Sequence, residues 1–378
     1  MAEKIFVGMS GGVDSSVAAA LLLQQGKEVV GGYMKNWINE ENVIGNCPWQ
    51  QDIEDARKVA DHLGIEFRVV NLMQEYRDKI VNYLLAGYQA GLTPNPDIMC
   101  NREMKFGLFL EYARAEGFDG VGTGHYARKI AHPDGTFGIL EGVDKNKDQS
   151  YFLALLRQEQ IASAHFPLGH LEKSEVRALA ESLGLPNHAK KDSQGICFIG
   201  EVRMADFLKT FVPDNPGPIV DLEGRVLGRH DGLHLYTIGQ KRGVGVASPV
   251  HATPYVVLEK RIATNELVMG FDRPDTPGLY TSRCLVGEIS LTRNPLPLGT
   301  PLEAKPRYRA ARQAITLHQT PEQAQNNRME VHFATPQRAI APGQFCAFYQ
   351  GEELLGGAVF LHTEDSHSPF EAETTAAL

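Results

Sequence analysis

The segment Lys4–Ser16 (KIFVGMSGGVDSS) decides the fold of the N-terminal part of the chain. Its first five residues form a short apolar run that ends at Gly8, as in a buried strand. A glycine-rich turn follows, and Asp14–Leu23 then carries an apolar stripe at helical spacing. A strand, turn and helix in this order direct backbone N–H groups and the positive helix end toward an anion. The segment therefore predicts a phosphate-binding loop.

The composition of the turn supports this prediction. Gly11 and Gly12 let the backbone approach an anion without a Cβ in the way, and Ser10, Ser15 and Ser16 add hydroxyl donors. No Gly-Lys-Ser/Thr follows, so this is not the loop that holds a γ-phosphate through its lysine. The alternative is a plain strand-to-helix turn with a serine as N-cap. The full run of donors favours the phosphate site.

The rest of the chain predicts an α/β protein of several domains. Residues 1–203 alternate strand-like and helical runs, which is typical of a parallel sheet covered by helices. The strand-like runs are 28–33, 66–71 and 120–124, and the helical runs are 52–63, 75–90, 104–116 and 174–183. Short strands and many glycines predict a central β-rich domain at 204–278, and alternating runs predict a β-barrel at 279–363. Residues 364–378 are expected to form a polar tail.

The composition is that of an ordinary globular protein. The 378 residues are 43% hydrophobic and 22% charged, and no apolar run has transmembrane length. A strand begins within four residues of the N-terminus, so we expect no signal or transit peptide. The five cysteines are far apart and form no Cys-x-x-Cys, unlike a secreted disulfide framework or a zinc ribbon. We expect a cytoplasmic protein without a membrane partner.

The net charge of −9 argues at first against a nucleic-acid partner. The charge is unevenly distributed, because residues 351–378 carry six acidic groups and no Lys or Arg, which leaves −3 for residues 1–350. Basic clusters occur at 190–191, at 241–242 and at Lys305, Arg307, Arg309 and Arg312. Binding to phosphate depends on such local patches more than on the total charge. The alternative for each cluster is a solvated surface.

Two of the cysteines are candidate nucleophiles. Cys100 follows Asp97 by three residues and is followed by Arg102, and an acid–base group and a positive charge tune the reactivity of a thiol. Cys197 follows the polar turn 192–195, which suits an exposed thiol.

A cysteine is more often a small buried apolar residue than a nucleophile. That interpretation suits Cys284 and Cys346, which lie in strand-like runs. Cys47 lies in a polar loop and receives no role.

The loop SGGVDSS (10–16) resembles that of the PP-loop ATPases, or N-type ATP pyrophosphatases, which cleave ATP between the α and β phosphates and adenylylate an oxygen. The resemblance narrows to the tRNA 2-thiouridylases through segments 93–107, 123–128, 142–153, 190–201, 230–243, 305–310 and 341–345. It runs to about residue 361. It implies an adenine-nucleotide α-hydrolase-like catalytic domain with a parallel sheet.

The resemblance also implies roles for single residues. Cys197 would receive sulfur as a persulfide, Cys100 would attack it and leave a Cys100–Cys197 disulfide, and Asp97 would be the acid–base residue. The implied ATP-binding residues are Gly8, Met9, Ser10, Gly11, Gly12, Val13, Asp14, Ser15, Met34 and Gly124. The implied tRNA contacts are Asn95, Pro96, Asp97, His125, Lys147, Asp148, Gln149, Arg307, Tyr308 and Gln344.

The implied activity is ATP-dependent 2-thiolation of the wobble uridine in tRNAs for Lys, Glu and Gln. Adenylylation makes the C2 oxygen a good leaving group, and sulfur then displaces it. The implied cofactors are ATP and Mg²⁺, and the implied donor is a sulfur relay protein fed by a cysteine desulfurase. Asp97, Cys100 and Cys197 could in principle ligate an iron–sulfur cluster, but no cysteine spacing demands one.

Several alternatives stay open at this point. Asp97 could cap a helix near Met99, His125 could be a strand-end histidine bonded to backbone, Met34 could be a core residue, and Gln344 could be a turn residue. A calcium loop at 144–155 is excluded, because its sixth position is not glycine and its twelfth is not glutamate. A different PP-loop ligase or a non-enzymatic sulfur carrier are the competing functions.

Overall fold

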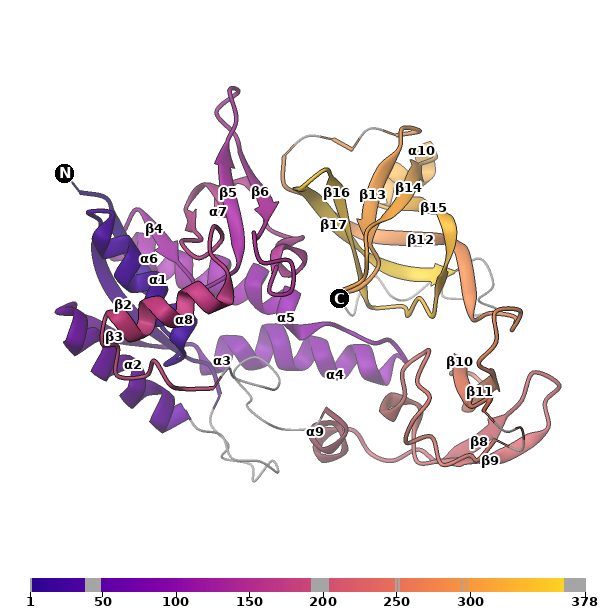
Figure 1. Cartoon of the computed structure of the whole chain (residues 1–378). Helices are drawn as coiled ribbons and strands as arrows, with labels where there is room; N and C mark the ends of the chain where they lie inside the picture. Colours follow the sequence, from indigo (N-terminus) through magenta and orange to yellow (C-terminus); the bar gives the residue numbers. More distant parts are fainter. Residues whose placement is uncertain are drawn as a thin grey trace.

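The computed structural model describes residues 2–37, 49–191, 204–248, 250, 252–293, 295–296 and 298–363. The predicted polar tail lies outside these residues. An α/β domain, a small β unit and a β-barrel follow one another along the chain (Figure 1). The predicted fold class is confirmed, with a parallel-sheet α/β domain, a β-rich middle and a C-terminal barrel.

The α/β domain is built on a parallel sheet of order β3-β2-β1-β4-β7. Its strands are β1 (Lys4–Gly8), β2 (Glu28–Lys35), β3 (Phe67–Asn71), β4 (Gly120–Gly122) and β7 (Ala164–His165). β1 pairs in parallel with β2 on one side and with β4 on the other, and the strand order reverses between β1 and β4. Ligands of such sheets bind at the carboxyl ends of the strands at this reversal. The loop after β1 lies at that position.

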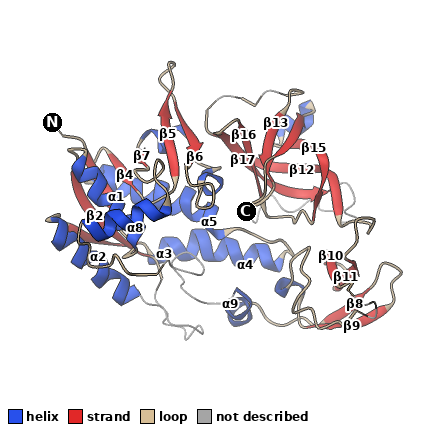
Figure 2. Cartoon of the chain, in the orientation of Figure 1, coloured by secondary structure: helices blue, strands red, loops and turns tan. Residues whose placement is uncertain are grey.

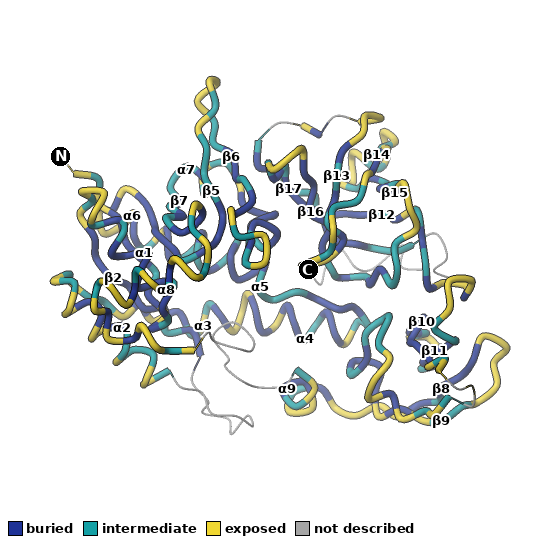
Figure 3. Tube along the Cα trace, viewed as in Figure 1, coloured by how far each residue is buried: buried dark blue, intermediate teal, exposed yellow. Residues whose placement is uncertain are grey.

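The helices between residues 13 and 211 are drawn in blue in Figure 2, and some of them contact the strands of the sheet. They are α1 (Val13–Gln24), α2 (Trp49–Leu63), α3 (Met73–Tyr76), α4 (Asn82–Gln89), α5 (Pro96–Met99), α6 (Phe109–Ala115), α7 (Gln158–Ala162), α8 (Lys173–Ser182) and α9 (Met204–Phe211), with η1 (Arg77–Val81), η2 (Cys100–Leu108) and η3 (Ser150–Leu153). Phe6 of β1 stacks on Phe109 with ring centroids 4.6 Å apart. Figure 3 shows the resulting buried core.

The helix predicted for 104–116 differs from the structure. The helical path begins at Pro96, and its Cys100–Leu108 part is π-helical. Gly107 has non-helical backbone angles, and a Cβ there would lie 2.9 Å from the carbonyl oxygen of Arg102. The extra residue per turn explains why periodicity alone missed this irregularity, since π segments interrupt the 3.6-residue spacing.

The C-terminal strands close a barrel. They are β12 (Tyr280–Leu291), β13 (Leu302–Lys305), β14 (Gln313–His318), β15 (Met329–Arg338), β16 (Phe345–Gln350) and β17 (Glu353–Thr363), with α10 (Pro321–Gln325). Closure follows because β12 pairs with both β15 and β17. The hairpin of β5 (Ala127–Ala131) and β6 (Phe137–Glu141) joins this sheet through β17. Cys284 and Cys346 are buried in the barrel core, as predicted.

The middle unit contains β8 (Gly217–Val220), β9 (Val226–His230), β10 (Tyr255–Arg261), β11 (Glu266–Phe271) and the short helix η4 (Leu233–Leu235). A bulge in β10 precedes Lys260, which pairs with the buried Leu267. Lys260 is buried and its Nζ has no hydrogen-bond partner. Burial lowers the pKa of Lys260 to about 7, because an apolar interior disfavours the ammonium form.

Lys260→Met is expected to stabilise the middle unit. The unfolded chain keeps the lysine proton up to an ordinary pKa of about 10.4. The unfolded state therefore binds more protons between about pH 7 and pH 10, and stability rises with pH through that window. The substitution should raise the free energy of unfolding near neutral pH by more than about 1 kcal/mol and flatten this rise.

Hydrogen exchange of β10 and β11 at several pH values measures the effect. Arg261→Met is a control on the same strand, because Arg261 is paired with Glu259 and Glu266 and is partly exposed. A less stable Lys260→Met protein would contradict the prediction.

Among the described residues, no helix has both the length and the apolar character needed to cross a membrane.

Candidate functional site

The loop after β1, which we call the cradle, leads into the start of α1. Gly12 is the N-cap residue and carries no side chain to cap the helix. The first-turn N–H groups of a helix lack helical acceptors, so here they can serve an anion. Ser15 Oγ donates to the Gly12 carbonyl at 3.0 Å and accepts from Ser10 N at 3.1 Å, which shapes the turn. The alternative of a serine-capped turn is wrong.

Gly11 is required by its conformation and by its contacts. Its φ is +75°, and a Cβ there would lie 2.4 Å from the carbonyl oxygen of Asp52 on α2. The predicted site residues Met9 and Val13 have buried side chains, so only their backbone can face a ligand.

Distant residues complete the cradle. A Cβ on Gly124, after β4, would lie 2.8 Å from the backbone of Asp14 and 2.9 Å from Ser15 N. A Cβ on Gly8 would lie 3.8 Å from Met34 Cε, so β2 contributes as well. The structure thus brings Gly8, Met34, Gly124 and the loop together at the β1–β4 reversal. Glycine at position 124 lets the backbone after β4 pack directly against the first turn of α1.

Three residues at the loop were not predicted from the sequence. Tyr126 donates its hydroxyl hydrogen bond to Asp14 Oδ1 at 2.9 Å, and Lys173 Nζ lies 2.7 Å from the same oxygen. Asn187 donates to the Gly11 carbonyl and to Ser16 Oγ, each at 2.9 Å. The Asn187 side-chain oxygen is buried without a partner. No local sequence signal indicates these contacts, because they join residues more than 100 positions apart.

The segment with the first candidate thiol begins at a helix cap. The side chain of Asn95 accepts hydrogen bonds from Asp97 N at 3.1 Å and Ile98 N at 3.4 Å, and Pro96 occupies the first helical turn. The alternative that Asp97 caps this helix is therefore wrong, because Asn95 does so. Asp97 lies three residues before Cys100 on a helical path, so the two share a face.

Cys100 itself is fully buried, with 0% of its surface exposed. Arg102, which we expected to supply positive charge, is paired with Glu103 at 2.7 Å. Cys197 and Cys47 lie outside the described residues, and so does the polar turn at 192–195. The pairing of Cys100 with Cys197 therefore stays a prediction.

The predicted tRNA contact His125 is buried. Its Nδ1 lies 2.8 Å from Thr123 Oγ1, and its ring packs beside Phe106 and Phe166. Burial holds the pKa of His125 well below its ordinary value, and the charge of Lys105 adds to this. The side chain is therefore neutral at pH 7. Its partner is a side-chain hydroxyl, which corrects the alternative of a backbone-bonded strand-end histidine.

Two of the predicted tRNA contacts, Asp148 and Gln149, make hydrogen bonds within the fold. Asp148 is buried and accepts from Gly142 N at 3.0 Å and from Lys305 Nζ at 3.0 Å. Gln149 accepts from Tyr126 N at 3.0 Å, next to the nucleotide cradle. Their predicted contact with tRNA stays a prediction.

The basic cluster at 305–312 is divided by the structure. Lys305 is largely buried and lies 2.8 Å from Glu141 Oε1, in addition to its contact with Asp148. Burial favours a raised pKa for Glu141, but hydrogen bonds from Lys305 and Lys145 outweigh it and lower the pKa. Arg312 lies 3.2 Å from Glu303. Lys305 is thus an internal ion-pair partner and does not belong to a surface patch for RNA, contrary to our expectation.

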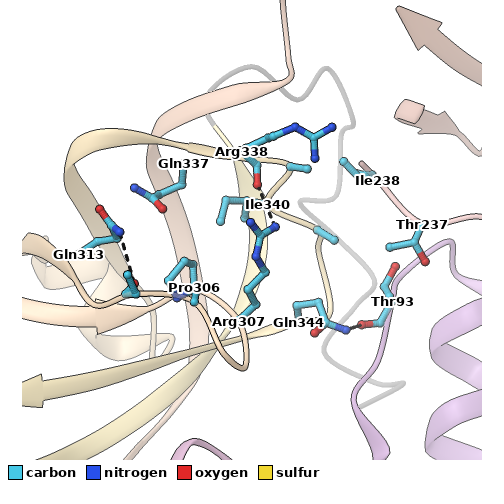
Figure 4. Close-up of a pocket in the computed structure, with 14 residues that line it drawn as sticks. Thr93, Thr237, Ile238, Pro306, Arg307, Gln313, Gln337, Arg338, Ile340 and Gln344 are labelled. Atoms are coloured by element: carbon cyan, nitrogen blue, oxygen red, sulfur yellow. Dashed lines mark hydrogen bonds between the residues drawn. The ribbon is translucent and has the colours of Figure 1, made fainter. Parts of the chain in front are cut away.

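Arg307 and Gln344 meet in a pocket of about 400 Å³ (Figure 4). Gln344 Nε2 donates to the Thr93 carbonyl at 2.6 Å, and Arg307 reaches the Arg338 carbonyl at 3.5 Å. Thr237 and Ile238 of the middle unit complete the lining. The pocket is therefore lined by all three parts of the chain. One of its lining residues, Thr93, precedes Asn95 by two positions. Tyr308, the next residue along the chain after Arg307, has its ring centroid 4.4 Å from that of Phe152.

The described residues contain no group of three or more His, Cys, Asp or Glu side chains able to hold a metal ion. Mg²⁺ bound with a nucleotide needs only one or two carboxylates besides the phosphates, and Asp14 fits that role. The iron–sulfur alternative is not tested, because Cys197 lies outside the described residues.

Comparison with known proteins identifies relatives of each part. Family models match residues 3–201 as a tRNA methyl transferase HUP domain, 205–271 as a tRNA methyl transferase PRC-barrel domain, and 281–360 as an aminomethyltransferase beta-barrel domain. The NMN synthetase structure from Francisella tularensis is 20% identical and covers 54% of this chain and 71% of that chain. Its TM-score of 0.34 is too low to support any inference.

Curated relatives are similar over nearly their whole length. The tRNA-specific 2-thiouridylase MnmA of Akkermansia muciniphila is 58% identical over 94% of this chain and 98% of its own. Proteins of the same name are 48% identical in Pseudomonas fluorescens and 45% identical in Alkaliphilus oremlandii. They match 94% of this chain, and 94% and 96% of their own lengths. These names describe sulfur transfer, whereas two of the domain descriptions mention methyl transfer.

Proposed function

The chain belongs to the tRNA-specific 2-thiouridylase family, and we propose that it replaces the C2 oxygen of the wobble uridine in tRNA with sulfur, using ATP. The single observation that carries the proposal is the nucleotide cradle, in which Gly124 lies against the backbone of Asp14 and Ser15. Methyl transfer needs no such site for ATP phosphates. We therefore favour thiolation over the methyl transfer that the domain descriptions mention.

The first step activates the base. The C2 carbonyl of uracil is a poor electrophile, because oxide is a poor leaving group. The C2 oxygen attacks the α-phosphorus of ATP, its bond to phosphorus forms, and pyrophosphate leaves. The N–H groups at the start of α1 would bind the phosphates, and Asp14 would hold Mg²⁺. Mg²⁺ supplies charge neutralisation of the departing pyrophosphate when it is bound.

The second step transfers sulfur. Cys197 receives a sulfur atom as a persulfide from a sulfur relay protein fed by a cysteine desulfurase. The terminal sulfur attacks C2, and AMP leaves with the former C2 oxygen. The Cys100 thiolate then attacks Sγ of Cys197, which breaks the persulfide S–S bond and leaves the outer sulfur on C2. The product is the 2-thio base and a Cys100–Cys197 disulfide. A cellular thiol reductant must then supply two electrons before the next cycle. Asp97, on the same helical face as Cys100, would move the protons.

The substrate must present its base unstacked. Chemistry on a stacked base requires that the nucleotide turn out into a pocket. Asn95 and Pro96 would border the target base, and Arg307 and Gln344 would contact the tRNA nearby, which their shared pocket supports. By family resemblance we propose that the substrates are the tRNAs for Lys, Glu and Gln. On the same ground we propose that the protein acts in the cytoplasm.

We expect the purified protein to thiolate tRNA in the presence of ATP, Mg²⁺, a cysteine desulfurase with cysteine as the persulfide source, and a thiol reductant. Mass spectrometry of digested tRNA should show a uridine with the mass change of an oxygen-to-sulfur exchange at the wobble position. Omitting ATP is the control. A mass change of one methyl group, or modification without ATP, would contradict the proposal.

A further inference from the structure

The phosphate-binding loop has no lysine of its own, although the pyrophosphate that leaves it is highly negative. The loop Gly8–Ser16 contains Asp14 and no Lys or Arg. Enzymes of phosphoryl and nucleotidyl transfer place cations where charge develops on the leaving group. A cation from elsewhere in the fold would add to the charge that Mg²⁺ supplies.

Lys173 is placed to supply that cation. It is the first residue of α8, its Nζ lies 2.7 Å from Asp14 Oδ1, and its side chain is only 13% exposed. The ammonium group also lies 5.9 Å from the ring centroid of Tyr126, which itself bonds Asp14. The position is fixed by the backbone, because Lys173 N donates to Asp144 Oδ2 at 3.0 Å.

A second lysine near the loop provides a contrast. Lys190 Nζ lies 2.8 Å from Asp52 and 2.7 Å from Asp55, two carboxylates of α2. Its charge is therefore neutralised by carboxylates of α2, the helix that contacts Gly11. Lys173 instead contacts the carboxylate that a Mg²⁺ ion would take, so nucleotide binding would exchange its partner.

We propose that Lys173 is the catalytic cation of the ATP site. Its ammonium group would bind the phosphates beyond the α-phosphorus and stabilise the departing pyrophosphate, and Asp14 would be the carboxylate that holds Mg²⁺. The assignment rests on the proposed function for its reaction, but its nucleotide binding can be tested separately. The competing explanation is that the Asp14–Lys173 pair only fastens α8 to α1.

The test compares ATP with AMP, because only ATP carries the phosphates that Lys173 would touch. Calorimetry with the full chain and Mg²⁺ should show that Lys173→Met weakens ATP binding about tenfold or more and AMP binding about twofold or less. Lys173→Arg should recover most of the ATP affinity, because it keeps the charge. Release of pyrophosphate with tRNA present should fall about a hundredfold in Lys173→Met, at saturating ATP.

Lys190→Met is the matched control, and it should change ATP and AMP binding equally while lowering the unfolding midpoint. Equal weakening of ATP and AMP binding by Lys173→Met, or unchanged ATP binding, would overturn the assignment. If Lys173→Met selectively weakens ATP binding but the wild-type protein does not thiolate tRNA, the proposed function fails and the role of Lys173 in nucleotide binding stands.

Discussion

A Cys100→Ser protein is expected to accept sulfur from a donor and then fail to complete turnover, so that 2-thiouridine formation falls to background. The serine hydroxyl cannot attack a persulfide and cannot form the disulfide that releases the sulfur atom. Cys197→Ser should fail one step earlier and carry no persulfide at all. A persulfide assay on the protein, together with mass spectrometry of the tRNA, separates the two defects.

The structure supplies matched controls for this experiment. Cys284 and Cys346 are as deeply buried as Cys100, at 2%, 0% and 0% exposure. Their serine variants place a similar hydroxyl in an apolar site, and we expect some loss of stability but unchanged activity per folded molecule. Normal turnover in Cys100→Ser, or an equal loss in all three variants, would contradict the catalytic role.

The burial of Cys100 has a consequence for the mechanism. A thiolate must touch the sulfur it attacks, so the side chain has to become accessible during the cycle. Cys100 begins the π-helical segment Cys100–Leu108, and such segments are frequent at functional sites. The neighbouring pair of Arg102 and Glu103 links this segment to Lys79 on η1, at 3.3 Å from Glu103.

The parts that sequence patterns predicted well are local ones. Apolar runs and a glycine turn within Lys4–Leu23 were enough for the strand, loop and helix. The predicted helix started only at residue 104, because the π-helical turns of Cys100–Leu108 break the 3.6-residue spacing. The sequence left Asp97 open as the cap of this helix, because both Asn95 and Asp97 are good N-cap types and only backbone geometry distinguishes them.

Contacts between distant residues could not be predicted. Lys173 and Tyr126 reach Asp14 across 159 and 112 positions, and a single sequence carries no sign of such pairs. The same limitation misassigned Lys305. A lysine beside Arg307 looks like part of a basic patch until the fold brings Glu141 and Asp148 against it.

Lys305→Met is therefore expected to damage stability. Lys305 of β13 reaches Glu141 at the end of β6 and Asp148 beyond it, so it ties the barrel to the catalytic domain. The two carboxylates are each only 4% exposed. Glu141 keeps Lys145 as a partner at 2.9 Å, but Asp148 loses its cation, and removing one partner of a buried ion pair costs about 3 kcal/mol. Urea unfolding of the full chain measures this loss.

Two variants decide whether the loss comes from this network. Lys305→Met combined with Asp148→Asn should cost less than Lys305→Met alone, because the remaining charge is partly removed. Arg307→Ala, at the pocket, should leave stability within about 0.5 kcal/mol and reduce the salt dependence of tRNA binding by about one phosphate contact. The opposite result is a Lys305→Met protein with the wild-type free energy of unfolding and a weaker salt dependence of tRNA binding, as in Arg307→Ala. Lys305 would then contact RNA, and the internal ion pair would not be its main role.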